Sequence, residues 1–142
     1  MPNTLVIAPN WIGDAVMTEP FIRQLRDSGH KLSILATPWV APVYRAMFPN
    51  PEVIEVAFSH GKLELSQRIK TAQFLKTLNF TQAFLLPNSW KSIVIPLLAN
   101  IPEIYGYKGE LRSFFLKKYL ANPPKKDRPP MVSHYLKLAD LV

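Results

Sequence analysis

Short apolar runs alternate along the chain with segments in which apolar residues recur every third or fourth position. Residues 4–8 (TLVIA) form such a run, and turn-forming residues follow it. A continuous apolar run of this length is typical of a strand that is buried on both faces of a sheet. Further runs of this kind predict strands at residues 31–36, 53–57, 82–86 and 104–107.

The intervals between the predicted strands have helical periodicity. Met17, Phe21 and Leu25 are spaced by four residues, which predicts a helix that begins at Asp14. Pro20 lies inside this segment, and an interior proline removes a main-chain hydrogen bond and usually kinks a helix. We therefore expect one kinked helix after the first strand.

Later segments also have the spacing of helices. One of them has an apolar face made of Leu65, Ile69, Ala72, Leu75 and Leu78. Others are predicted at residues 39–48, 89–100, 111–120 and 132–142. Strands that alternate with helices favour a parallel sheet with right-handed crossovers. Residues 1–142 are thus expected to form a single α/β domain with a doubly wound, mainly parallel, Rossmann-like sheet.

In such a sheet, ligands bind in the loops beyond the carboxyl ends of the strands. The segments expected to meet at this edge are residues 9–14, 59–62, 87–91 and 106–112. Gly13 is the only glycine of the first loop, so the G-x-G-x-x-G fingerprint of a dinucleotide site is missing. The phosphate-binding motif G-x-x-x-x-G-K-[ST] does not occur in the chain either. The first loop is therefore not expected to hold a nucleotide.

Asp14 is the candidate for chemistry in the first loop. A carboxylate at the mouth of the sheet can take a proton from a substrate hydroxyl as a general base, and Gly13 beside it permits a tight turn. Aspartate is also a common N-cap of helices. Spacing alone favours the cap, and it leaves the catalytic role open.

Basic and aromatic residues lie near the other loops. The basic ones are His60, Lys62, Arg68, Lys70, Lys108 and Arg112. Composition alone favours a solvated loop and helix edge for His60, Lys62, Arg68 and Lys70. For Lys108 and Arg112 it leaves a solvated position and a binding role equally open. Residues 111–120 mix aromatic with basic residues, which predicts a core-packed helix with snorkelling lysines, with membrane-surface contact as the alternative. Trp11, Trp39 and Trp90 are expected in the core or at the rim of a pocket.

Composition narrows the classes of partner and compartment. Lys and Arg number 17 against 10 Asp and Glu, and the resulting net charge of +7 suits nucleic acid, an anionic membrane surface or a phosphorylated substrate. Without cysteine there are no disulfides or thiolate metal ligands, and the three histidines are too far apart in sequence to suggest a metal cluster. A signal peptide and an apolar stretch long enough to span a bilayer are both missing, so a cytoplasmic protein is expected.

Four segments in register resemble a known family. They are PNWIGD at residues 9–14, SHGKLE at 59–64, LPNSWKS at 86–92 and GYKGELR at 106–112. In order and spacing they are similar to the ADP-heptose:lipopolysaccharide heptosyltransferases, and the resemblance covers essentially the whole chain. It implies the GT-B architecture, in which two Rossmann-like domains face a cleft. This chain would be the N-terminal, acceptor-binding domain, without the C-terminal, donor-binding domain.

The resemblance implies an inverting transfer of heptose from ADP-heptose to the inner-core heptose of lipopolysaccharide. Asp14 would be the general base. The acceptor would be bound by Asn10, Trp11, Gly13, His60, Lys62, Arg68, Asn88, Ser89, Lys91, Lys108 and Arg112. No metal or cofactor is implied, and ADP-heptose would be bound mainly by the missing domain, so this chain alone is expected to be inactive.

The partners implied are the phosphorylated lipopolysaccharide inner core, ADP-heptose, the donor domain and the cytoplasmic face of the inner membrane. Two interpretations from other classes stay open. A basic nucleic-acid-binding module would have a known motif or base-stacking aromatic residues interleaved with basic ones, and neither is found; nucleic acid is therefore not expected as a partner. A Rossmann-like domain that docks on another protein without catalysis is the second.

Overall fold

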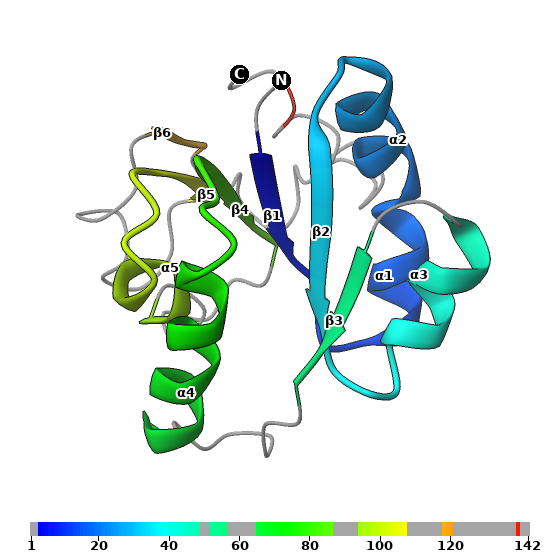
Figure 1. Cartoon of the computed structure of the whole chain (residues 1–142). Coiled ribbons are helices and arrows are strands. Elements are labelled where there is room, and N and C mark those ends of the chain that lie inside the picture. The colour runs from blue at the N-terminus through cyan, green and yellow to red at the C-terminus, as the bar shows by residue number, and fades with distance from the viewer. Residues whose placement is uncertain are drawn as a thin grey trace.

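The computed structural model describes residues 3–48, 52–56, 65–86, 94–107, 118–120 and 139. Its centre is a six-stranded sheet in the order β3-β2-β1-β4-β5-β6, in which every pair of neighbours is parallel (Figure 1). The strands are β1 (Asn3–Ile7), β2 (Lys31–Ala36), β3 (Glu52–Glu55), β4 (Gln82–Leu85), β5 (Glu103–Tyr107) and β6 (Lys118–Leu120).

The strand order reverses direction between β1 and β4. The chain winds outward from β1 through β2 to β3, then returns to the other side of β1 and continues through β4 and β5. The expected doubly wound parallel sheet is thereby confirmed. Ile7 pairs with both Leu35 and Leu85, so the strands on either side of the reversal end at nearly the same level. Such a reversal is the place where doubly wound sheets bind ligands.

Helices cover both faces of the sheet (Figure 1). They are α1 (Ile12–Met17), α2 (Glu19–Asp27), α3 (Ala41–Met47), α4 (Leu65–Lys76) and α5 (Val94–Leu98). Alternate residues of each strand point to opposite faces. Val6 and Phe84 therefore belong to a core shared with α1, α2 and α3, whereas Leu5 and Leu85 belong to a second core shared with α4 and α5.

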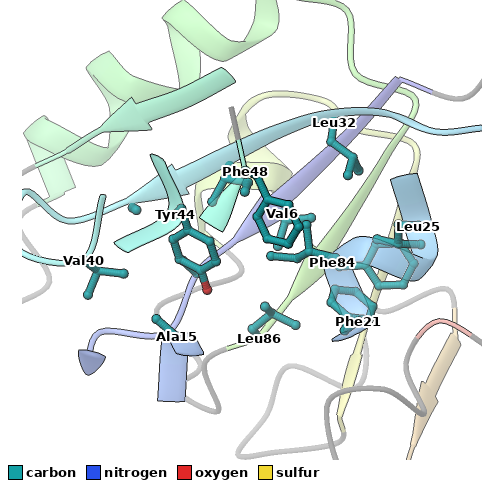
Figure 2. Packing of buried hydrophobic residues seen from close by; sticks show 14 of the residues in the cluster. Val6, Ala15, Phe21, Leu25, Leu32, Val40, Tyr44, Phe48, Phe84 and Leu86 are labelled. Atoms are coloured by element: carbon teal, nitrogen blue, oxygen red, sulfur yellow. The ribbon is translucent and has the colours of Figure 1, made fainter. Parts of the chain in front are cut away.

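Phe84 is at the centre of the first core (Figure 2). Its ring packs edge to face against Phe21 of α2 at 5.2 Å between centroids, and tilted against Tyr105 of β5 at the same distance. Edge and tilted arrangements are the favourable ones for aromatic pairs. These contacts join α2, β4 and β5 into one packed unit.

The prediction of one kinked helix after β1 is wrong, because two helices meet at Thr18. The first begins at Ile12 rather than at Asp14. Pro20 lies in the first turn of α2, where a main-chain N–H has no helical partner, so the proline carries little penalty. The Thr18 hydroxyl lies 2.6 Å from the Ala15 carbonyl and 2.7 Å from the Tyr44 hydroxyl, which fixes the break against α3.

The predicted apolar face of α4 is shifted around the helix. Ile69 is 38% exposed, whereas Arg68 is only 8% exposed and Thr71 is also buried. The buried positions are Arg68, Thr71, Ala72 and Leu75, which have helical spacing of three and four residues. The sequence indicated the correct helix but placed Ile69 on the wrong side of it.

The prediction of a helix at residues 111–120 is wrong for its last three residues, which form β6 and pair in parallel with β5. A strand edge offers unpaired N–H and C=O groups, and pairing with it outweighs a local helical pattern. Residues 108–117 lie outside the described part, as does the predicted helix at 132–142 except Ala139, which is buried in the first core. None of the described helices is long and apolar enough to span a membrane.

A polar cluster lies at the amino ends of the central strands. The Gln82 amide donates to the Thr4 hydroxyl and to Nδ1 of His30, at 2.9 Å in both cases. Thr4 and Gln82 are buried, and His30 is partly buried. Burial lowers the pKa of His30 from its usual 6.5. Burial thus favours the neutral imidazole, and an amide N–H of Gln82 can only donate, so Nδ1 accepts in this contact.

Candidate functional site

The carboxyl ends of β2, β1 and β4 form one continuous edge at the bottom of Figure 1. The Ala8 N–H donates to the Leu35 carbonyl at 2.9 Å, and the Leu86 N–H donates to the Ile7 carbonyl at 3.1 Å. Main-chain bonds thus continue past the ends of the strands on both sides of β1. The loop from β1 to α1 leaves this edge at the reversal of strand order, where a ligand is expected.

Asp14 is the third residue of α1 and not its N-cap. The N-cap is Trp11, which has an extended backbone and makes no side-chain capping bond. The capping role that spacing favoured for Asp14 is therefore wrong. Its side chain is partly buried, and its carboxylate makes no hydrogen bond or ion pair within the described part of the chain. A carboxylate without such a partner is available to accept a proton.

Gly13 does not have the role of a tight-turn residue that its position suggested. It lies inside α1, and a Cβ atom built on it meets nothing within 4 Å. The glycine is therefore not required by crowding in the chain itself. It leaves open space beside Asp14.

Two tryptophans stand exposed at this edge. Trp11 is 61% exposed and Trp39, in the loop after β2, is 47% exposed. The Trp39 indole N–H donates to the Asn10 carbonyl at 2.7 Å, so the two loops are joined by a side chain. Ile12 and Val16 on α1 are exposed as well. Of the two positions expected for Trp11 and Trp39, the core and the rim of a pocket, this exposure excludes the core. The hydrogen bond from Trp39 to Asn10 could not be predicted from the sequence.

Thr37 marks the exit of β2 at the same edge. Its carbonyl accepts the N–H groups of Val40 and Ala41, which shapes the turn into α3. Its hydroxyl is buried and has no hydrogen-bond partner among the residues that the structure describes. A buried hydroxyl without a partner is uncommon in folded proteins.

Arg68 lies near the beginning of α4, the helix that follows β3. The solvated position that composition favoured for it is wrong, since the residue is buried and takes part in an interaction. Lys70, two residues further, is exposed as a solvated face requires. A buried charge costs much free energy unless it is paired, so Arg68 is part of the packed structure around α4.

The structure thus brings Asn10, Trp11, Gly13 and Asp14 together at the carboxyl edge and adds Trp39 to them. Of the other predicted site residues, Arg68 is buried in α4 and is not placed at this edge, and the rest lie outside the described part of the chain, namely His60, Lys62, Asn88, Ser89, Lys91, Lys108 and Arg112. Among the residues that are described, no group of three His, Asp or Glu is placed to hold a metal ion.

Comparisons with known proteins agree with this fold. The family model of glycosyltransferase family 9 (heptosyltransferase) matches residues 68–142. The lipooligosaccharide heptosyltransferase 2 of Haemophilus influenzae is 36% identical over 139 residues, which are 96% of this chain and 39% of that protein. This chain therefore spans about two fifths of the length of the curated relatives that it matches.

Solved structures have the same fold. The structure of Escherichia coli ADP-heptose lps heptosyltransferase II is similar with a TM-score of 0.81 and 31% identity, over 96% of this chain and 40% of that one. Escherichia coli heptosyltransferase WaaC with ADP-2-deoxy-2-fluoro heptose has a TM-score of 0.76 at 17% identity, over 98% of this chain and 47% of that one, which is a likeness of fold.

Proposed function

Because the chain belongs to glycosyltransferase family 9, the heptosyltransferases, we propose that it is the acceptor-binding half of an enzyme that moves heptose from ADP-heptose to an inner-core heptose of lipopolysaccharide. The observation that carries the proposal is Asp14, a partly buried carboxylate with open space beside it at the carboxyl edge of a doubly wound sheet. This is the position at which such a fold presents groups to a ligand.

Asp14 is the general base of the proposed reaction. An acceptor hydroxyl loses its proton to the Asp14 carboxylate while its oxygen forms a bond to the anomeric carbon of the donor heptose. The bond from that carbon to the diphosphate breaks on the opposite side, ADP leaves, and the configuration at the carbon is inverted. Proton transfer to a positioned base contributes about 10²–10⁴-fold to a rate. The step needs no metal or cofactor.

The basic residues of the other loops bind the acceptor. A phosphorylated inner core is anionic, and the chain has a net charge of +7. Hydrogen bonds between ionised groups are roughly twice as strong as those between neutral ones. Lys62, Lys91, Lys108 and Arg112 are proposed to bind the phosphates and carboxylates of the acceptor. The acceptor is linked to lipid, so we place the reaction at the cytoplasmic face of the inner membrane.

ADP-heptose binds mainly to a second domain. The loop after β1 has no glycine-rich fingerprint for a diphosphate, and the related heptosyltransferases are more than twice as long as this chain. Stabilisation of the departing diphosphate therefore comes from that other domain, through basic groups or helix N-termini.

A transfer assay tests the proposal. The protein encoded by the complete reading frame is incubated with ADP-heptose and a lipopolysaccharide acceptor that lacks the next heptose. We expect release of ADP that depends on the acceptor, and a product heavier by one heptose. Residues 1–142 alone should release none. Absence of transfer by the complete protein, together with salt-dependent binding to generic RNA or DNA, would instead favour the nucleic-acid module.

A further inference from the structure

Trp39 is presented from a rigid part of the fold. The turn from β2 into α3 is closed by main-chain bonds from the Val40 and Ala41 N–H groups to the Thr37 carbonyl, at 3.1 and 2.9 Å. Val40 and Ala41 are fully buried in the first core, next to α1 (Figure 2). Trp39 lies inside this turn and directly precedes the buried Val40, so its backbone has little freedom.

The indole of Trp39 acts on the segment that leads to Asp14. Its N–H reaches the carbonyl of Asn10, the residue before the N-cap of α1. The N-cap carbonyl, on Trp11, in turn accepts the first helical bond from the Ala15 N–H at 2.9 Å. Fixing the Asn10 carbonyl therefore fixes the peptide plane from which α1, and Asp14 with it, begins.

Folding alone does not account for a tryptophan at this position. Nearly half of the Trp39 surface is in solvent, and the hydrogen bond to Asn10 is itself exposed. Trp11, Ile12 and Val16 of the neighbouring loop and helix are exposed as well, and exposed apolar side chains that gather in one patch commonly mark an interaction site. The loop it holds is the one that leaves the sheet at the reversal of strand order.

We propose that Trp39 is a positioning residue, which holds the main chain of the β1–α1 loop so that the Asp14 carboxylate meets the acceptor hydroxyl. The proposal rests on the function proposed above, because it concerns the same reaction. Trp39 acts through Asn10 and does not itself exchange a proton. A displacement of about 1 Å of a reacting group can lower a rate by about 10²-fold, so the loss of this one bond should lower kcat.

Two replacements of Trp39 isolate the bond. Incorporation of 3-benzothienylalanine at position 39 replaces the indole N–H by sulfur and keeps the shape of the ring, and Trp39→Phe removes the N–H with a smaller ring. In the protein made from the complete reading frame, we expect kcat to fall by about 10- to 100-fold with the KM of the acceptor nearly unchanged. Amide hydrogen exchange at residues 15–18, whose N–H groups are the first to be hydrogen-bonded in α1, should become faster.

Arg45→Ala is the matched control. Arg45 lies on α3, the helix that Trp39 precedes, and its exposed guanidinium pairs with Glu55 at 2.8 Å, away from the β1–α1 loop. Its loss perturbs the same helix and should leave both kcat and the exchange at residues 15–18 unchanged.

Three results would overturn the proposal. They are unchanged kcat in both replacements, a rise in acceptor KM in place of the fall in kcat, and unchanged amide exchange at residues 15–18. The exchange measurement needs no substrate, so it decides the role of Trp39 even where the wild-type protein transfers no heptose. A wild-type protein that transfers no heptose would overturn the proposed function but not the account of the loop.

Discussion

Thr18 and Thr37 offer the same substitution in two buried sites that differ in hydrogen bonding. Thr18 is fully buried, and its hydroxyl lies 2.6 Å from the Ala15 carbonyl and 2.7 Å from the Tyr44 hydroxyl. Thr37 is 6% exposed, and its hydroxyl has no partner. Replacement of threonine by valine keeps the shape of the side chain and exchanges only its hydroxyl for a methyl group. The pair therefore separates the contribution of hydrogen bonds from that of packing.

The magnitudes follow from the number of bonds. A typical intramolecular hydrogen bond contributes about 0.5–1.5 kcal/mol net, so Thr18→Val, which loses two, should lower the free energy of unfolding by about 1–3 kcal/mol. Thr37→Val removes a buried polar group that gains nothing in the folded state, and it should leave stability unchanged or raise it by up to about 1 kcal/mol.

Urea unfolding followed by circular dichroism measures both variants. A change in midpoint without a change in slope reports stability alone. Tyr44→Phe, alone and with Thr18→Val, completes a double-mutant cycle, for which we expect a coupling of about 0.5–1.5 kcal/mol. If Thr37→Val costs as much as Thr18→Val, or if the cycle has no coupling, the hydrogen bonds do not hold the junction of α1 and α2.

Two further predictions concern the opposite ends of the sheet. Because burial lowers the pKa of His30 below 6.5, the unfolded chain binds this proton more readily, so stability is full at neutral pH and falls as pH drops below about 6.5. Urea unfolding at about pH 7.5 and about pH 5.5 should reveal this loss, and His30→Gln should reduce it; an equal loss in the variant would contradict it. At the carboxyl edge, replacement of Lys62, Lys108 or Arg112 by glutamate in the complete protein should raise the acceptor KM by about 10- to 100-fold, with a smaller effect on the donor KM. If steady-state kinetics give an unchanged acceptor KM in all three variants, these residues do not bind the acceptor and belong to a solvated face.

The central strands could be predicted because each is buried on both faces and is therefore largely apolar. Their arrangement in a doubly wound parallel sheet could be predicted because helical segments separate them in the sequence. The break at Thr18 could not, since it depends on a bond to Tyr44 in another helix. Nor could β6, a strand whose pairing depends on the free edge of β5. Local sequence does not report such long-range partners.

The candidate site was predictable to a similar extent. The position of Asp14 at the carboxyl edge follows from its place after the first apolar run. Whether it caps α1 depends on where the helix begins, and the helix begins earlier than the periodicity indicated. The hydrogen bond from Trp39 to Asn10 joins two residues that are distant in the sequence, and no local pattern marks them as partners. The burial of Arg68 depends on the rotation of α4, which the apolar pattern predicted with Ile69 on the buried face.

The general-base role of Asp14 is the claim on which the account depends most. Asparagine has nearly the same size as aspartate but cannot accept the proton. Since Asp14 neither caps α1 nor pairs with another described residue, Asp14→Asn should leave the melting temperature of the complete protein unchanged.

The deciding measurement is the kcat of heptose transfer by Asp14→Asn at saturating ADP-heptose and acceptor. The account predicts that kcat falls by about 10²–10⁴-fold while the melting temperature and the acceptor affinity stay at wild-type values. A kcat within a few-fold of wild type would contradict it and would place the base elsewhere.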